Sequence, residues 1–162
     1  MKRGDDRIFS YVTTDYSYLG GAHPNFVYNG YNYDTKTGKR LTLRDVTEDY
    51  DSLYAQVLDT LRAFGEEQED FMFFEDYEDT VKGMFYGFSA EEDLEDSDMT
   101  DADREEISDT AGTASDIDNI QWYLTDNELV VIFNRYDIAA YVFGPTAVKI
   151  PFETGLVKEI YS

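Results

Sequence analysis

The residues that could take part in chemistry are one histidine and a large number of carboxylates. His23 is the only histidine, and it follows Gly20-Gly21, a glycine pair that interrupts the strand pattern before it. Its imidazole could act as a general base or bind a ligand, or it could hydrogen-bond to nearby backbone and hold the turn. Serine occurs without a glycine-elbow nucleophile motif and cysteine is absent, so no catalytic set surrounds His23. The sequence favours the structural role and predicts no catalytic residues.

Asp96, Asp98, Asp101 and Asp103 are spaced like part of a calcium-binding loop. An EF-hand loop starting at Asp96 would need glycine at its sixth position and glutamate at its twelfth, where the sequence has Asp101 and Ile107. The pattern fails, so we predict no specific metal site and no cofactor. Carboxylates are so abundant that no pair suited to glycoside hydrolysis stands out.

The net charge of −22 is the most extreme property of the sequence. It argues against nucleic acid binding, which needs clustered Lys and Arg, and it would attract basic partners or divalent cations. A role in solubility or salt adaptation would give the same charge. No apolar run of about 18 residues is present, so we expect no membrane span. The first six residues are not followed by an apolar stretch, so no signal peptide is expected either.

The C-terminal part of the sequence predicts the centre of a β-sheet. Residues 120–124 and 129–133 are short apolar runs separated by Asp126-Asn127, which is typical of a β-hairpin. Residues 129–133 show no polar alternation, which indicates a strand covered on both faces. Residues 147–152 predict a further strand that Pro151 ends. Trp122 shares the first of these strands with apolar neighbours, and we expect it to be buried.

The N-terminal and central parts predict more strands and then helices. We expect strands at residues 7–19 and 26–33, with Gly30 as a possible bulge, and a third strand marked by Leu41 and Leu43. Asp49 is a suitable N-cap for a helix that ends near Gly65, and residues 74–88 suggest a second helix. The fold class is therefore α+β: an antiparallel sheet built from both ends of the chain, with the central helices packed on one face.

We expect one domain over residues 1–162. Residues 91–118 are acidic and contain few large apolar side chains. Such a segment buries too little surface to offset its ordering entropy, so we interpret it as a mobile surface insertion.

Two loops have the composition of a recognition surface. Residues 20–26 and 139–146 combine glycine and proline with aromatic side chains, and both adjoin apolar strands. Within the second loop, Tyr141 and Phe143 could equally well plug the end of the sheet. The candidate partner-binding residues are Gly21, His23, Asn25, Tyr141, Phe143 and Pro145.

Parts of the sequence also resemble a known domain type. The matching stretches are Gly20–Asn25, Tyr31–Asp34 and Thr37–Lys39, and then Trp122–Asp126, Tyr136–Ala139, Gly144-Pro145 and Val148–Phe152. In their residue types, order and spacing they resemble the ectodomain of the RsiV-type anti-sigma factors, which sense lysozyme. The same domain type is also found attached to peptidoglycan deacetylases.

The resemblance implies a non-catalytic, extracytoplasmic sensor domain that binds lysozyme and thereby triggers proteolysis of the anti-sigma factor. Lysozymes are typically basic, which suits the acidic sequence. With no membrane span and no sigma-binding region in the sequence, we expect at most the sensing part of a membrane-anchored or secreted parent. The alternatives are a cell-wall carbohydrate enzyme or its accessory domain, with cell-wall glycan as a partner, and a purely structural domain.

Overall fold

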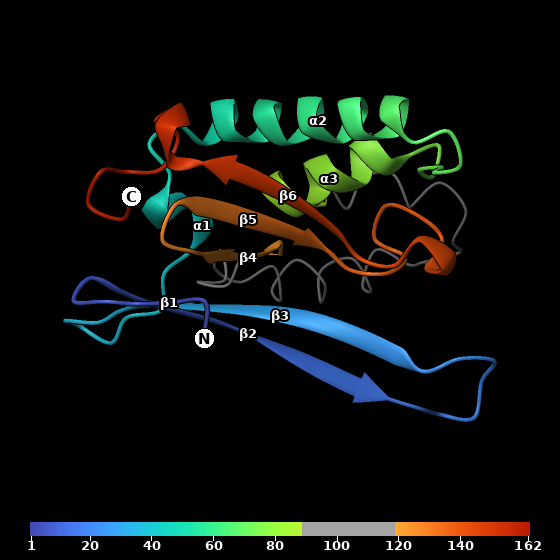
Figure 1. The fold of residues 1–162 in the computed structure, drawn as a ribbon, viewed down its shortest axis with the longest axis horizontal. Helices are drawn as coiled ribbons and strands as arrows, with labels where there is room; N and C mark the ends of the chain where they lie inside the picture. Colours follow the sequence, from blue (N-terminus) through green and yellow to red (C-terminus); the bar gives the residue numbers. More distant parts are fainter. Residues whose placement is uncertain (89–118) are drawn as a thin grey trace, which may run out of the picture.

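The computed structural model describes residues 1–88 and 119–162, which form two β-sheets and a layer of helices (Figure 1). The helices lie on one side of the second sheet, and the first sheet lies on the other side (Figure 1). The predicted α+β class, with antiparallel strands from both ends of the chain and helices on one face, is confirmed. The strands form two three-stranded sheets where one sheet was expected. The predicted insertion at residues 91–118 lies outside the described residues.

The first sheet consists of β1 (Arg3–Gly4), β2 (Ile8–Ser17) and β3 (Asn25–Asp34) in the order β1-β2-β3. The antiparallel register of β2 and β3 runs without interruption from Ile8 opposite Asp34 to Ser17 opposite Asn25. Gly30 lies directly opposite Val12 in this register, so the predicted bulge is absent.

The second sheet consists of β4 (Gln121–Leu124), β5 (Glu128–Phe133) and β6 (Thr146–Pro151), with β5 in the centre. Residues 129–133 are all buried, as their uninterrupted apolar run predicted. Trp122 is also buried, with 3% of its surface exposed. The hairpin at Asp126-Asn127 and the strand ending at Pro151 are confirmed.

The helices are α1 (Leu43–Val46), α2 (Tyr50–Glu67) and α3 (Tyr77–Tyr86). Asp49 caps α2 as predicted, because its carboxylate accepts a hydrogen bond from the Ser52 amide at 3.0 Å. The third strand predicted at Leu41 and Leu43 is wrong. Thr42 and Asp45 form a reciprocal capping box, which starts the short helix α1 at Leu43.

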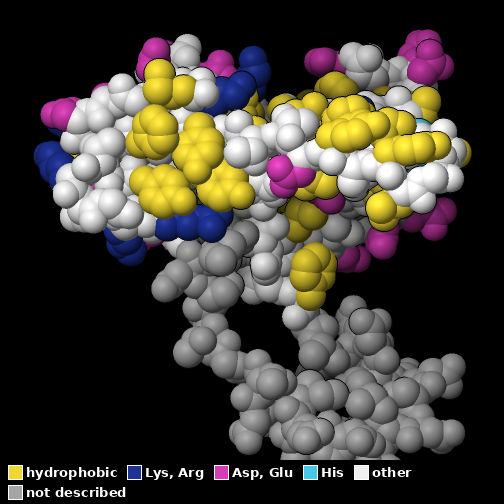
Figure 2. Space-filling model, turned by 90° about the horizontal axis from the view of Figure 1, so that it is seen from below, with side chains coloured by type: hydrophobic (Ala, Val, Ile, Leu, Met, Phe, Trp, Pro, Cys, Tyr) yellow, Lys and Arg dark blue, Asp and Glu magenta, His cyan; other side chains and the backbone are white. Residues whose placement is uncertain are grey.

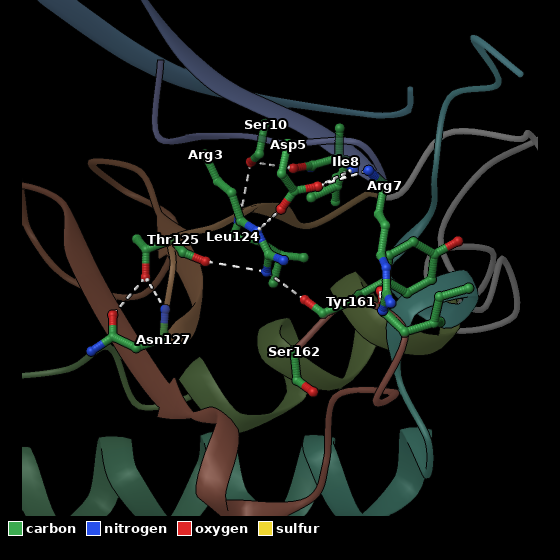
Figure 3. Close-up of polar contacts among 12 residues, drawn as sticks. Arg3, Asp5, Arg7, Ile8, Ser10, Leu124, Thr125, Asn127, Tyr161 and Ser162 are labelled. Carbon is green, nitrogen blue, oxygen red and sulfur yellow. Dashed lines mark hydrogen bonds and ion pairs between the residues drawn. The ribbon is translucent and has the colours of Figure 1, made fainter. Parts of the chain in front are cut away.

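A chain of buried polar groups joins the two sheets. The Ser10 hydroxyl donates to Asn32 Oδ1 at 2.6 Å, and Asn32 Nδ2 donates to the Trp122 carbonyl at 3.0 Å. The Leu124 amide donates in turn to Ser10 Oγ at 3.0 Å (Figure 3). Ser10 and Asn32 are almost fully buried, so these bonds satisfy groups that water cannot reach.

Two more amide side chains bond to the edge of β3 that faces away from β2. Asn134 accepts from the Tyr28 amide at 2.7 Å and donates to the Tyr28 carbonyl at 3.2 Å, as a peptide group of a neighbouring strand would. Gln121 Oε1 accepts from the Gly30 amide at 2.9 Å. Side chains therefore occupy the edge of β3 where a further strand could otherwise pair.

The N-terminal segment fastens the first sheet to the C-terminus. The Arg3 guanidinium donates to the Asp5 carboxylate at 2.7 Å and to the backbone carbonyls of Thr125 and Tyr161 (Figure 3). The Arg7 guanidinium donates to the Ile160 carbonyl at 2.9 Å. These contacts hold the N-terminal and C-terminal segments together at one end of the first sheet. The loop between β2 and β3 lies at the opposite end of the hairpin.

We expect Gly30→Ala to destabilise the protein strongly, because a Cβ at Gly30 would lie 2.0 Å from the Trp122 carbonyl oxygen. Overpacking of this kind usually costs about 1–3 kcal/mol of stability. Here the clashing atom belongs to the backbone of Trp122, which cannot move aside as a flexible side chain could. Urea unfolding measures the change. Gly21→Ala is the matched control, because a Cβ there meets no atom within 4 Å. Equal stability of the two variants would contradict the close approach of the sheets.

We expect Ser10→Ala and Asn32→Ala to affect stability non-additively, because each removes a member of one hydrogen-bond chain. Asn32→Ala also removes the hydrogen bond from Asn32 to the Trp122 carbonyl, and loss of one such bond typically costs about 0.5–1.5 kcal/mol. A double-mutant cycle measured by urea unfolding should give a coupling free energy of at least about 0.5 kcal/mol. Simple addition of the two effects would show that the groups act independently.

Candidate functional site

The two loops predicted to form a recognition surface lie in direct contact. The His23 ring stacks on the Tyr141 ring with 3.6 Å between ring centroids and 15° between the planes. The Tyr141 hydroxyl donates to the Pro24 carbonyl at 2.8 Å. Tyr141 begins a single 3₁₀ turn, Tyr141–Phe143, which Gly144 ends with a φ of 74° that favours glycine. One tyrosine thus links the β2–β3 loop to the β5–β6 loop through both its ring and its hydroxyl.

Arg135 lies beneath this contact, between two aromatic rings. Its guanidinium carbon is 5.4 Å from the centroid of Phe26 and 4.9 Å from that of Tyr141. Its Nε and Nη1 are buried and have no hydrogen-bond partner among the residues that the structure describes. The ring faces therefore supply the stabilisation that a carboxylate usually gives a buried guanidinium.

Asp137 forms the turn next to Arg135. Its carboxylate accepts a hydrogen bond from the Asn134 amide at 2.6 Å. Burial raises the pKa of Asp137, while the hydrogen bond from Asn134 acts in the opposite direction. Between them, Tyr136 has a φ of 69°, a backbone conformation that a bulky residue rarely adopts. This local strain occurs where the turn presents the Tyr136 ring to solvent.

Several large apolar side chains on the two loops and at the end of β2 are exposed. The exposed fractions are 63% for Tyr16, 57% for Tyr18, 97% for Leu19, 56% for Tyr136 and 81% for Val142. Tyr16 packs against Phe26, and Tyr136 lies 5.8 Å from Tyr141, so both belong to the cluster around Arg135. We call residues 16–26 and 134–145 together the tip surface. Exposed apolar groups in this number are typical of an interaction site.

The structure separates the six predicted site residues into three groups. Gly21, His23 and Asn25 are exposed on the β2–β3 loop and at the start of β3, and Tyr141 joins them through His23. Phe143 instead packs against Phe71, with 4.6 Å between ring centroids, on the side of the helices.

Pro145 lines a separate hollow of about 180 Å³ between the two sheets. The other residues that line it are Lys2, Val12, Tyr28, Tyr123, Ile132, Thr146 and Ala147. Gly21, His23, Asn25 and Tyr141 can therefore be reached together by one partner at the tip surface, whereas Phe143 and Pro145 contribute by shaping the loop.

The predicted site residues did not include Arg135, the exposed Tyr16 and Tyr18, or Phe26, although Phe26 lies within one of the two predicted loops. Arg135 is the only basic residue between Arg104 and Lys149 in the sequence. An isolated arginine next to Tyr136 could have indicated that Arg135 belongs to the site. The contact with Phe26 had no local signal, because more than a hundred residues separate the two positions. Within the described residues, no group of three His, Asp or Glu side chains could hold a metal ion. None of the described helices is long and apolar enough to cross a bilayer.

Two solved structures share the fold. One is a protein of the DUF3298 family from Bacteroides fragilis, with a TM-score of 0.55 and 21% identity, matched over 94% of this chain and 49% of that one. The other is a DUF3298 family protein from Pseudomonas aeruginosa, with a TM-score of 0.59 and 20% identity, matched over 99% of this chain and 61% of that one. The chain thus spans about half to three fifths of the length of these structures, and at such identity the likeness shows the fold alone.

No protein of curated function matches the chain. Residues 55–153 match a sequence family described as a protein of unknown function, DUF3298. The matched segment begins within α2, so it contains the β5–β6 loop with Arg135 and Tyr141 and leaves out the β2–β3 loop. Because the match covers more than half of its residues, the chain belongs to the DUF3298 family.

Proposed function

We propose that this protein is a non-catalytic, extracytoplasmic sensor domain whose tip surface binds a protein partner. The observation that carries the proposal is the contact of the two loops through His23, Pro24 and Tyr141. A loop pair fixed in this way loses little conformational entropy when a partner binds, and preorganisation of this kind raises affinity.

The composition of the tip surface supports a protein partner. Tyrosine and arginine are among the residues most often found at the energetic centre of protein interfaces. Here the Tyr141 ring contacts Arg135, and Tyr136 lies 5.8 Å from Tyr141. The exposed Leu19 and Val142 would add apolar area at the border of such an interface. The tip surface has few charges, so we expect aromatic packing to determine how long a complex lasts.

A lysozyme is the partner that we propose, and the resemblance to the RsiV-type ectodomain supports it. The net charge of −22 supports it independently, because a strongly acidic protein attracts a basic one at long range. An extracytoplasmic location, in a membrane-anchored or secreted parent, belongs to the same proposal. Long-range attraction and short-range aromatic contact can be separated experimentally, since they affect association and dissociation differently.

We expect Tyr141→Ala to shorten the lifetime of the complex with lysozyme at least about tenfold, which corresponds to about 1.4 kcal/mol. Tyr141→Phe keeps the stack on His23 but loses the bond to Pro24, so its effect should be smaller. Biolayer interferometry with immobilised lysozyme measures both dissociation rates. Ile160→Ala, at an exposed apolar residue of the C-terminal segment, is the control. Unchanged dissociation in both Tyr141 variants, with intact thermal midpoints, would rule out the tip surface.

We expect salt to slow association with lysozyme and to leave dissociation nearly unchanged. Raising the ionic strength from about 0.01 to 0.15 M shortens the Debye length from about 30 to 8 Å, which removes long-range attraction. The association rate should fall about tenfold or more, as for other oppositely charged pairs. Stopped-flow measurements at several salt concentrations test this. Binding that salt abolishes altogether, through a much faster dissociation, would indicate attraction without a specific site.

A further inference from the structure

The outer face of the first sheet carries a second group of aromatic side chains. Phe9 and Tyr11 on β2 lie opposite Tyr33 and Tyr31 on β3, so the four side chains share one face. The rings of Tyr11 and Tyr31 are 5.0 Å apart between centroids and nearly parallel, and Phe9 lies 5.4 Å from Tyr11. We call these four residues the aromatic face.

The other elements lie on the opposite side of this sheet. The second sheet and the helices lie on one side of the first sheet (Figure 1). Ser10 and Asn32 face that side, because both bond to backbone groups of β4. On the outer side, Phe9 is 40% exposed and the three tyrosines are half-buried. No described segment packs over the aromatic face, although burial of four rings would be favourable. The rings are therefore available to a ligand.

The segment that carries the aromatic face has a net charge opposite to that of the molecule as a whole, and Arg40 is the cation that contacts the face. Arg3 and Arg7 bind carbonyls of the C-terminal segment, and Lys2 lies over the Tyr123 ring of the second sheet. Residues 1–40 contain six basic and four acidic side chains, a net charge of +2. Residues 41–88 and 119–162 contain six basic and 18 acidic side chains, a net charge of −12. The Arg40 guanidinium carbon lies 5.2 Å from the Tyr31 centroid. In Figure 2 a group of hydrophobic side chains is bordered by Lys and Arg.

We propose that the aromatic face binds a linear anionic glycan, such as a chain with one carboxylate on every second sugar. The C–H groups of a sugar ring carry partial positive charge and pack against the negative face of an aromatic ring. Tyrosine hydroxyls offer hydrogen bonds to sugar hydroxyls, and Arg40 can bind a carboxylate through a charge-assisted hydrogen bond. The aromatic rings would thus contact the sugar rings of such a ligand, and the guanidinium of Arg40 would bind its carboxylate.

Charge density favours this ligand over a nucleic acid, which also stacks on aromatic residues beside arginines. Double-stranded DNA carries one charge per about 1.7 Å, and binding it requires many clustered cations. The small positive excess of residues 1–40 within a strongly acidic protein cannot meet that requirement. A glycan with spaced carboxylates needs only a few cations. The proposal does not rest on the protein partner proposed for the tip surface, which occupies the other end of the hairpin.

The test uses a hyaluronan hexasaccharide and the whole chain. Titration followed by ¹H–¹⁵N NMR should show saturable shifts at β2 and β3 residues around Tyr11 and Tyr31, with none at residues 18–24. Tyr31→Leu keeps apolar bulk but removes the ring, and it should weaken binding about tenfold, the equivalent of about 1.4 kcal/mol. Arg40→Gln should weaken binding several-fold and remove most of its salt dependence. Tyr18→Ala, on the tip surface, is the matched control and should bind like the wild type.

Four results would contradict the proposal. The first is an absence of saturable shifts in the wild-type protein, which does not depend on any variant folding. The second is equal or tighter binding of oligothymidylate at the same residues, which would indicate nucleic acid. The third is unchanged affinity in both Tyr31→Leu and Arg40→Gln. Chitohexaose is the neutral comparison, and equal affinity for it would contradict the role given to the charge.

Discussion

The packing of the two sheets depends on amide side chains that bond to the backbone of the neighbouring strand. Asn134 pairs with both polar groups of Tyr28, Gln121 accepts from Gly30, and Asn32 donates to Trp122. These bonds perform the function of a strand ladder between β3 and the second sheet. They require the backbones to approach closely, which the absence of a Cβ at Gly30 permits.

The same constraint positions the tip surface. Asn134 bonds to Tyr28 at the point where the chain leaves β5, and Arg135 follows at once between Phe26 and Tyr141. The amide pairing therefore fixes the start of the β5–β6 loop against β3 independently of the contacts that the other loop residues make. The stack of His23 on Tyr141 completes an arrangement that the strands have largely determined.

Local sequence patterns predicted most helices and strands correctly, but they could not predict contacts between residues that are far apart in the sequence. The apolar run at residues 129–133 and the cap at Asp49 depend on neighbours in the sequence, and both were correct. Leu43 was assigned to a strand from its alternation with Leu41, and the capping box of Thr42 with Asp45, which is also a local signal, was overlooked. The division into two sheets depends on single amides such as Gln121, which leave no periodic signal. The loops of the tip surface were recognisable from their composition, but the place of Arg135 between two rings was not.

The uneven distribution of charge gives the described part of the molecule an electric dipole, with consequences for its orientation. Residues 1–40 have a net charge of +2, whereas residues 41–88, which contain the helices, have a net charge of −10. Near a negatively charged polymer layer, the field would rotate the molecule until the first sheet faces the layer. The helices would then point outward, and the end of the hairpin would lie parallel to the layer and stay open to diffusing proteins. An acidic protein could in this way approach an acidic surface in one preferred orientation.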